Sequence, residues 1–360
     1  MNHYCTFFDR GYLIQGLALW RTLAVHDADA VLWVLALDED TAVTLRETGG
    51  TWLRVVPLAE MEAGDAELAA AKANRTLIEY YFTLQACWPH WLLARHPEID
   101  RVTEIDADMA FYSSPTPVFA AMDAAQASVL VTAHRFPAWL RHYEQHGKFN
   151  VGFLSFRRDA AGLACLEVWR TRCLAWCYDR VEDGKYAGQR YLDDWPVRLG
   201  SAVLVLPLPG VNLAPWNWAA HREEVGSDGQ VRVDGQPLVL FHFARFRPIC
   251  GTWWWQSGQL DYGVMPGRLR DAIYGPYWRA LATAREELRA GHPGFDFQRS
   301  SGRLGRNFWR GLLLRSVFGS DWLRVGGSFF SGRFGLGRFS GRCLAWLRRT
   351  LRRRRPGATA

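Results

Sequence analysis

The sequence predicts an α/β fold in which a mixed, mainly parallel sheet is flanked by helices, and three observations lead to that class. Segments with strand character alternate with segments of helical spacing through the first half of the chain. The run AVLWVLAL, residues 30–37, is apolar throughout, as strands buried in parallel sheets are. Acidic residues close two of the strands, and the carboxyl ends of strands are where ligands bind in open α/β sheets.

The expected elements follow in order along the chain. We expect strands at residues 3–8, 30–37, 52–58 and 101–109 in the first half, and at 128–134, 149–158, 202–208 and 238–243 in the second. Helical spacing covers residues 11–26, begins again at residue 41, and covers 65–96 as one or two helices interrupted near Pro89. A further helix is expected over 162–181, a hairpin over 228–243, and a helix from Pro276 to Gly291.

The chain divides into a body and a tail. After residue 291 the composition changes to Gly, Ser, Arg, Phe and Leu, so we expect a catalytic domain at 1–290 and an extension at 291–360. From Asp296 onward 15 Arg and two Asp give a balance of +13, and the whole-chain charge of +7 therefore leaves −6 for the preceding residues. The basic character belongs to the tail alone.

Cysteine usage and hydropathy indicate an intracellular protein. Seven Cys without a C-x-x-C pair favour free thiols in a reducing cytoplasm over disulfides or a zinc ribbon, and Cys173 and Cys177 are expected to be buried thiols. No stretch reaches the ~20 apolar residues of a membrane-spanning helix. The N-terminus lacks the basic and then apolar layout of a secretory signal.

Asp106 and Asp108, with Glu104 beside them, crowd at the end of the strand at 101–109. Carboxylates at such a place repel one another unless a cation or a structural contact compensates. The acidic pair in residues 38–40 also closes a strand and is a competing candidate, whereas the pair in 27–29 lies between a helix and a strand, where solvation or a turn accounts for it.

Five separated segments resemble the retaining glycosyltransferases of family 8 and related bacterial enzymes of the GT-A fold. DAD followed by FYSSPTPVF resembles their LDxDxxxxxxxxxLF segment, FNVGFLSF resembles FNAGVLLIN, and GQRYLDD resembles DQDxLN. LVLFHFARFRP is similar to their late strand with a histidine and a Lys-Pro step, and CTFFDRGYLIQGLALWRTL to the strand and helix around the nucleotide base. The matches span roughly residues 3–255 in the family's order, and they imply a GT-A fold and glycosyl transfer.

The resemblance implies a divalent metal held by Asp106, Asp108 and His242. A cation between these side chains and a diphosphate would compensate the charge of a departing nucleoside diphosphate. Carboxylates combined with imidazole suit Mn²⁺ better than Mg²⁺, although metal availability can override that preference. Taken alone, a histidine in an apolar strand such as that of His242 is first of all a core residue.

Further binding roles concern the nucleotide. The resemblance places Asp9 and Tyr12 at the uracil and ribose, and it places Arg247 where the family's lysine neutralises the leaving phosphate, after a one-residue gap. A guanidinium suits that task because its planar fork matches phosphate oxygens. Lys72 and Arg75, on a helix that enters the site, could contact the diphosphate or the sugar, with a solvated helix face as the alternative.

Asn150 and Gln189 match family positions that face the transferred sugar, although Asn150 also suits a turn before a strand. Gly188 departs from the family, because an aspartate that binds the donor sugar stands there in the family. Asp193, which falls on the family's asparagine, and its neighbour Asp194 are the candidates to replace that carboxylate. The departure leaves the sugar and the retaining stereochemistry open.

The tail interleaves arginine with leucine, phenylalanine and tryptophan, which is typical of segments that bind an anionic membrane surface. Nucleic-acid binding by the same charges and a disordered solubilising tail are the alternatives, and the apolar residues argue against the latter. We therefore expect a cytoplasmic enzyme attached to the inner face of the cytoplasmic membrane.

The expected function is transfer of a hexose from a nucleotide sugar to a glycan or glycolipid acceptor in cell-surface polysaccharide synthesis. A UDP-linked sugar is the leading candidate for the donor. One alternative is a metal-dependent nucleotidyltransferase that makes the activated sugar; the lack of a Gly-rich phosphate loop near the N-terminus counts against it. The other is a non-catalytic protein that binds membranes or nucleic acid through its arginines.

Overall fold

The computed structural model describes residues 1–48, 50, 52–250, 253–255, 262–292 and 322–324. The chain forms two compact units, one of residues 1–244 with 268–302 and one of residues 245–267 with 303–360. The expected division at residue 290 stays a prediction, since most residues of the tail lie outside the described ones.

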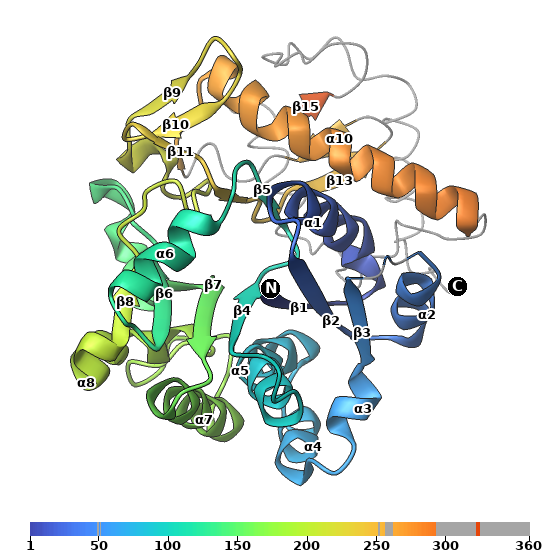
Figure 1. Ribbon diagram of the computed structural model, residues 1–360, viewed down its shortest axis with the longest axis vertical. Coiled ribbons are helices and arrows are strands. Elements are labelled where there is room, and N and C mark those ends of the chain that lie inside the picture. Colours follow the sequence, from blue (N-terminus) through green and yellow to red (C-terminus); the bar gives the residue numbers. More distant parts are fainter. Residues whose placement is uncertain (49, 51, 251–252, 256–261, 293–321, 325–360) are drawn as a thin grey trace, which may run out of the picture. The chain divides into compact units, whose positions relative to one another are not determined.

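A seven-stranded sheet forms the centre of the first unit, in the order β3-β2-β1-β4-β7-β6-β8 (Figure 1). Strands β1, β2, β3 and β4 pair in parallel, β8 pairs with β6 in parallel, and β7 runs antiparallel to both β4 and β6. The predicted class, a mixed and mainly parallel sheet, is confirmed. The strands span Asn2–Phe8 (β1), Ala30–Ala36 (β2), Leu53–Pro57 (β3), Arg101–Ile105 (β4), Val129–Ala133 (β6), Phe149–Arg157 (β7) and Val203–Val205 (β8).

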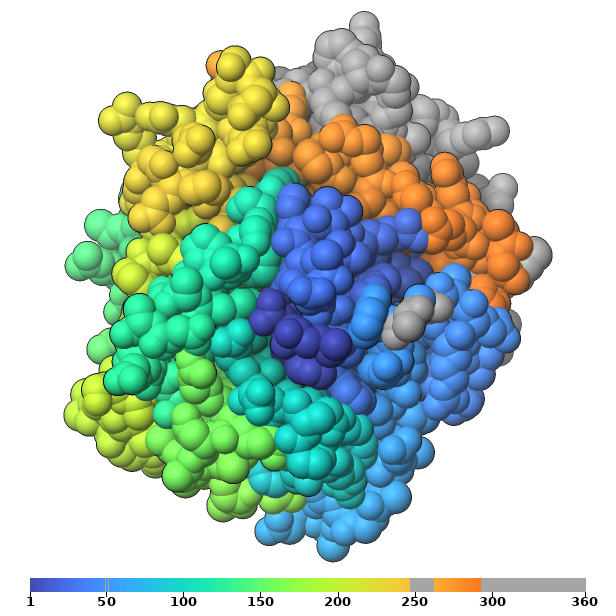
Figure 2. Space-filling view, in the orientation of Figure 1, coloured from blue at the N-terminus to red at the C-terminus, as the bar shows by residue number. Residues whose placement is uncertain are grey.

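Helices cover both faces of this sheet, and each face has its own apolar core. Helices α1, α6 and α10 pack on one face, and α3, α4, α5 and α7 pack on the other (Figure 1). In Figure 2 the orange surface of α10 lies against the blue surface of α1, where Arg21 forms an ion pair with Glu287. The helices span Leu13–His26 (α1), Glu39–Thr48 (α2), Leu58–Glu62 (α3), Ala66–Ala73 (α4), Leu77–Arg95 (α5), Thr116–Ala124 (α6), Ala160–Ala175 (α7), Trp195–Leu199 (α8) and Gly267–Gly291 (α10).

Two expectations about prolines were wrong. Helix α5 runs through Pro89 without a break, and α10 begins at Gly267 with Pro276 inside it. A proline in a helix interior costs roughly 3 kcal/mol. In α5 the burial of Trp88, Trp91 and Leu92 on the sheet outweighs that cost, because each buried side chain of this size contributes about 2 kcal/mol or more.

The expected hairpin is present, but its last strand leaves it. Strands β9 (Glu223–Val225), β10 (Val231–Val233) and β11 (Gln236–Pro237) are antiparallel, and the turns contain Gly229, Asp234 and Gly235 with positive φ. Strand β12 (Leu240–His242) pairs instead with β5 (Met109–Phe111). This separate two-stranded sheet connects the second half of the chain to the segment after β4.

The second unit contains a three-stranded antiparallel sheet of its own, β13 (Arg247–Cys250), β14 (Trp253–Trp255) and β15 (Trp322–Arg324). The cysteines at positions 5, 87, 165, 173 and 177 are buried free thiols. Within the described parts of the chain, no helix combines the length and the apolar character needed to cross a membrane.

Short 3₁₀ segments connect several of these elements. They span Arg10–Tyr12 (η1), Ala138–His146 (η2), Gln189–Asp194 (η3), Gly200–Ala202 (η4) and Trp218–Ala220 (η5).

The first turn of α5 is held by a capping box, in which Thr76 and Glu79 bond reciprocally to each other's backbone N–H. Replacing Thr76 by alanine should therefore lower the free energy of unfolding by about 1 kcal/mol, measured by urea titration. Thr171, exposed on α7, is the matched control: its replacement by alanine should be neutral or slightly stabilising, because alanine is the better helix former. Equal effects of the two substitutions would contradict the capping role.

Candidate functional site

Asp106, Asp108 and His242 come together at the carboxyl end of β4. The two aspartates lie in the turn between β4 and β5, and His242 is the last residue of β12, opposite Met109. The Nε2 atom of His242 is 3.2 Å from Asp108 Oδ1 and 3.6 Å from Asp106 Oδ2. One ligand atom from each of the three side chains lies within 4.8 Å of the others. The structure thus brings together the three residues that the sequence assigned to the metal.

Backbone contacts fix the turn that carries the aspartates. The N–H of Asp106 donates to the carbonyl of Gly152 on β7 at 3.1 Å, and the N–H of Phe243 donates to the carbonyl of Asp108 at 2.8 Å. A Cβ atom at Gly152 would lie 2.6 Å from Asp106 Oδ2, which is too close for any real contact. A side chain at position 152 would therefore displace the Asp106 carboxylate, which lies directly against the backbone there.

Burial has the largest effect on the pKa values of the cluster. Burial, and to a lesser extent the Asp108 carboxylate, raise the pKa of Asp106 to about 6 against the opposing effects of His242 and Gln85. Burial alone would lower the pKa of His242, but the carboxylates of Asp108 and Asp106 outweigh it, so that pKa is raised. Burial also raises the pKa of Glu104 well above its usual range, and the nearby Asp106 carboxylate adds to that effect.

The side chains present fit a divalent cation. Two carboxylates and one imidazole nitrogen face a common point, and these are ligand types that Mn²⁺ accepts. The other ring nitrogen of His242, Nδ1, is buried and has no hydrogen-bond partner among the described residues. Metal-binding histidines usually donate that N–H to an oxygen, so this site holds the ring by packing instead, with Trp216 edge-on at 5.0 Å between ring centroids.

The competing acidic pair has structural contacts of its own. Asp38 accepts backbone N–H groups from Arg10 and Thr41, both at 2.7 Å. Asp40 forms an ion pair with the Arg10 side chain at 2.6 Å and is largely exposed. Asp27, in the third acidic pair, accepts hydrogen bonds from Asn2 and Tyr4. Hydrogen bonds and solvent account for these carboxylates, which leaves the pair after β4 as the metal candidate.

Asp9 lies at the same edge of the sheet as the metal candidate. It follows β1, which pairs in parallel with β4, so both strands end on the same side. Its Oδ1 atom accepts the N–H of Gly11 at 2.8 Å, and its Oδ2 atom accepts the hydroxyl of Tyr81 at 3.4 Å. Tyr12 is 43% exposed at the end of η1, and its role at the nucleoside stays a prediction.

The basic residues predicted for the diphosphate occupy different settings. Lys72 forms an ion pair with Glu62 at 2.7 Å. Arg75 donates to the carbonyl of Leu174 at 2.6 Å and to the hydroxyl of Thr83, within the helical layer. Arg247 belongs to β13 in the second unit, and its side chain lies outside the described ones. The diphosphate roles of these residues stay predictions.

Asn150 is buried at the start of β7, adjoining the cluster. Its Oδ1 atom accepts the N–H of Gly152 and the side-chain amide of Asn212, both at 2.9 Å. A Cβ at Gly152 would lie 2.8 Å from that oxygen, so Asn150 and Asp106 approach the same point. Gln189 donates to the carbonyl of His146 at 2.9 Å.

The position that departs from the family faces helix α7. A Cβ at Gly188 would lie 3.1 Å from the sulfur of Cys173, and the carbonyl of Gly188 accepts the Trp169 indole N–H at 2.9 Å. A longer side chain there would meet packed residues. Asp193 accepts the N–H of Lys148 and pairs with Arg190, both at 2.7 Å, so both its oxygens are engaged. Asp194 pairs with Arg172 at 2.8 Å.

Three buried polar residues near the site were missed from the sequence. Gln85 of α5 donates to Asp106 Oδ1 at 3.3 Å, and Asn212 bonds Asn150. His134, at the end of β6, bonds Asn150 at 3.2 Å, and burial lowers the pKa of its imidazole to about 3, so it is neutral. A strand-end position could have indicated His134, whereas Gln85 and Asn212 carry no signal beyond a polar residue among apolar ones.

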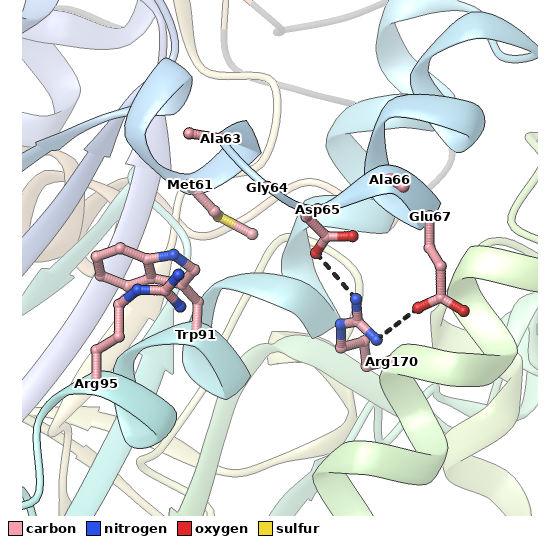
Figure 3. A pocket seen from close by; sticks show the side chains of 9 residues that line it. All are labelled: Met61, Ala63, Gly64, Asp65, Ala66, Glu67, Trp91, Arg95 and Arg170. Atoms are coloured by element: carbon pink, nitrogen blue, oxygen red, sulfur yellow. Dashed lines mark hydrogen bonds and ion pairs between the residues drawn. The ribbon is translucent and has the colours of Figure 1, made fainter.

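Two pockets of the first unit lie elsewhere. One, of about 360 Å³, lies between α3, α4 and α5; there Arg170 pairs with Asp65 and Glu67, and Arg95 stacks on Trp91 (Figure 3). The other, of about 420 Å³, lies between α1, α10 and the β9–β11 hairpin. Neither is lined by a residue of the Asp106, Asp108 and His242 cluster.

The described sheet has the mixed, mainly parallel order that the sequence predicted, and Asp106, Asp108 and His242 meet after β4. No family model matches the chain. Two Bacillus subtilis (strain 168) proteins match in sequence: the uncharacterized protein YfnF is 34% identical over 253 residues, covering 68% of this chain and 81% of YfnF. The uncharacterized protein YfnD is 28% identical over 301 residues, covering 81% of this chain and 93% of YfnD. The chain belongs to the family of YfnF.

Solved structures similar to this chain include glycosyltransferases. The galactosyltransferase LgtC, in complex with donor and acceptor sugar analogs, gives a TM-score of 0.47 at 16% identity, covering 80% of this chain and 99% of LgtC. Mouse xyloside xylosyltransferase 1 gives 0.40 at 15%, covering 59% and 87%. GlyE of Streptococcus pneumoniae TIGR4 gives 0.43 at 13%, covering 83% and 66%.

The raised pKa values of the cluster predict how metal binding depends on pH. A metal needs Asp106 as carboxylate and His242 as neutral imidazole, so protons compete with it. Mn²⁺ affinity should fall below pH ~6 by about tenfold per pH unit for each proton displaced, measured by electron paramagnetic resonance titration between pH 5 and 8. The free energy of unfolding of the metal-free protein should change with pH in the opposite direction to the Mn²⁺ affinity. Because the pKa of Asp106 is raised in the folded protein, the stability that Asp106 contributes is present at low pH and is lost as pH rises towards about 6. Equal Mn²⁺ affinity at pH 5 and 7.5 would contradict the assignment.

Proposed function

We propose that this protein is a glycosyltransferase that moves a hexose from a UDP-linked donor to a glycan or glycolipid acceptor. One observation supports this most directly. Asp106, Asp108 and His242 come from two segments far apart in the sequence and converge within 4.8 Å at the carboxyl edge of the sheet. The family resemblance implies a metal at these positions, and ligands of α/β folds bind at this edge.

The proposed chemistry is the departure of UDP from the donor sugar. A divalent cation, with Mn²⁺ as the leading candidate, would supply positive charge to the leaving diphosphate. Asp106 and Asp108 hold it from the turn after β4, and His242 holds it from β12. Because these side chains are partly or fully buried, their electrostatic effect on the diphosphate is stronger than it would be in water.

The remaining residues bind the rest of the donor. Asp9 and Tyr12, after the neighbouring strand β1, bind the nucleoside; Lys72, Arg75 and Arg247 are the proposed phosphate contacts. Asn150 and Gln189 face the sugar, with Asp193 beside them. Since both oxygens of Asp193 already accept bonds from Lys148 and Arg190, its proposed role is to hold the segment of Gln189 against β7. Transfer with retention of configuration is proposed from the resemblance alone.

The metal role is tested by replacing Asp108 with asparagine. The variant should keep its fold but lose Mn²⁺-dependent hydrolysis of UDP-sugars by 100-fold or more, roughly 3 kcal/mol, measured as released UDP across a donor screen. Asp40→Asn is the matched control, because Asp40 is exposed and pairs only at the surface with Arg10. Loss of hydrolysis in Asp40→Asn and its retention in Asp108→Asn would show that the wrong acidic pair was chosen. Pyrophosphate release from a sugar phosphate and UTP would favour the nucleotidyltransferase alternative.

We also propose that the segment from Asp296 onward attaches the enzyme to the inner face of the cytoplasmic membrane. The support is the charge distribution: a balance of +13 in this segment against −6 in the rest of the chain. An anionic bilayer repels the body, so any attraction has to come from the tail. Leucine, phenylalanine and tryptophan between the arginines supply apolar groups that can enter the interface.

The membrane role is tested by replacing the arginines between residues 333 and 355 with glutamine. The variant should lose sedimentation with phosphatidylserine vesicles, while UDP-sugar hydrolysis is unchanged because every described site residue precedes this segment. Raising salt to 0.5 M should weaken vesicle binding of the parent protein only in part, since apolar insertion is not screened. Complete loss at that salt, with equal binding to DNA, would indicate a general polyanion-binding tail.

A further inference from the structure

Helix α5 carries two polar side chains, one turn apart, that each contact an acidic residue at the end of a different strand. The Tyr81 hydroxyl donates to Asp9 Oδ2 at 3.4 Å, and the Gln85 amide donates to Asp106 Oδ1 at 3.3 Å. Residues four apart lie on the same face of a helix. One helical face therefore contacts the carboxylate after β1 and the carboxylate after β4.

The contact of Gln85 orients Asp106 toward the metal cluster. Gln85 is 6% exposed, and its amide bonds one carboxylate oxygen, Oδ1. The other oxygen, Oδ2, lies 3.6 Å from His242 Nε2. The backbone N–H of Asp106 is already fixed by the Gly152 carbonyl. With its backbone N–H and one carboxylate oxygen both held, the Asp106 side chain presents its second oxygen to the cluster.

The contact of Tyr81 acts in the same way on Asp9. The Oδ1 atom of Asp9 accepts the N–H of Gly11, and Oδ2 accepts the tyrosine hydroxyl. Burial, together with the nearby Asp9 carboxylate, raises the pKa of Tyr81, so its hydroxyl keeps its proton and remains a donor. One contact from its own turn and one from α5 thus hold the two carboxylate oxygens of Asp9.

Helix α5 is well placed to hold both contacts at a fixed separation. Its first turn is closed by the capping box of Thr76 and Glu79, and its next turns bury Leu84 and Trp88 completely. Strands β1 and β4 are hydrogen-bonded neighbours, with Cys5 opposite Glu104. A capped, buried helix lying across two paired strands has little freedom to move either contact.

We propose that Gln85 and Tyr81 are positioning residues, and that α5 thereby fixes the orientation of the metal-site carboxylate and of the nucleoside-site carboxylate from one rigid face. This inference rests on the proposed function, which assigns Asp106 to the metal and Asp9 to the nucleoside. It adds two residues outside the predicted set. It also predicts that replacing Gln85 weakens Mn²⁺ binding alone, and that replacing Tyr81 weakens UDP binding alone.

The test measures Mn²⁺ affinity and UDP affinity separately in four variants. Gln85→Leu should weaken Mn²⁺ binding by roughly tenfold, as loss of an outer-shell partner does, and leave metal-free UDP binding unchanged. Tyr81→Phe should weaken metal-free UDP binding by roughly threefold, the effect of one hydrogen bond, and leave Mn²⁺ binding unchanged. Mn²⁺ is titrated by electron paramagnetic resonance and UDP by calorimetry.

Matched controls remove equivalent groups that point elsewhere. Tyr80→Phe removes the neighbouring hydroxyl, which donates to Glu62 at 2.6 Å, and Thr103→Val removes a buried bond to Ser155 on β4 itself. Both should bind Mn²⁺ and UDP like the parent. Thermal unfolding verifies that each variant is folded, and Gln85→Met, which keeps the side-chain length, replaces the leucine variant if that one is unstable.

The outcomes separate the inference from the function on which it rests. If the parent binds Mn²⁺ and UDP but Gln85→Leu and Gln85→Met keep the parent's Mn²⁺ affinity, the positioning role is wrong while the proposed function stands. The same holds if Thr103→Val weakens Mn²⁺ binding as much as Gln85→Leu, because general loss of packing then accounts for the effect. A parent protein that binds neither Mn²⁺ nor UDP overturns the proposed function itself, and this inference with it.

Discussion

The approach of two carboxylates and an imidazole at the end of β4 is the constraint on which the rest of the site depends. In this partly buried turn, burial first and the neighbouring Asp108 carboxylate after it raise the pKa of Asp106. The Nε2 atom of His242 lies within 3.6 Å of a carboxylate oxygen of each aspartate and is their nearest charged partner. The cluster thus holds charge that a cation would neutralise, and its geometry has to be maintained by neighbouring elements.

Those neighbouring elements surround the cluster. The pairing of β12 with β5 places His242 opposite Met109, and helix α10 covers that small sheet, with Tyr277 stacked on Phe243 at 3.7 Å. From the other face, Gln85 of α5 reaches Asp106, and β7 contributes a glycine where any side chain would collide with the carboxylate. Core packing and site geometry therefore depend on the same elements, so core substitutions in them would also disturb the site.

Many acidic residues of this chain form bonds that hold the fold, and this explains why an Asp-x-Asp pattern alone is ambiguous. Asp38, Asp27 and Asp193 each accept hydrogen bonds from backbone or side-chain donors. Asp106 and Asp108 differ because their nearest charged partner is a histidine, which can lose its proton to become a ligand. The partners of a carboxylate, which come from segments distant in the chain, thus distinguish a structural aspartate from a candidate metal ligand.

The sequence by itself determined the alternation of strands and helices, the class of the sheet, the strand-end position of Asp106 and Asp108, and the basic tail, because these follow from local periodicity and composition. It could not show that α5 continues through Pro89, since burial of Trp88 and Trp91 outweighs the proline there. It also could not show that the segment of His242 leaves its hairpin to pair with β5, or that Gln85 contacts Asp106. Only the tertiary structure decided these points, because each is a contact between residues distant in the chain, whose energy depends on desolvation and packing that no local pattern records.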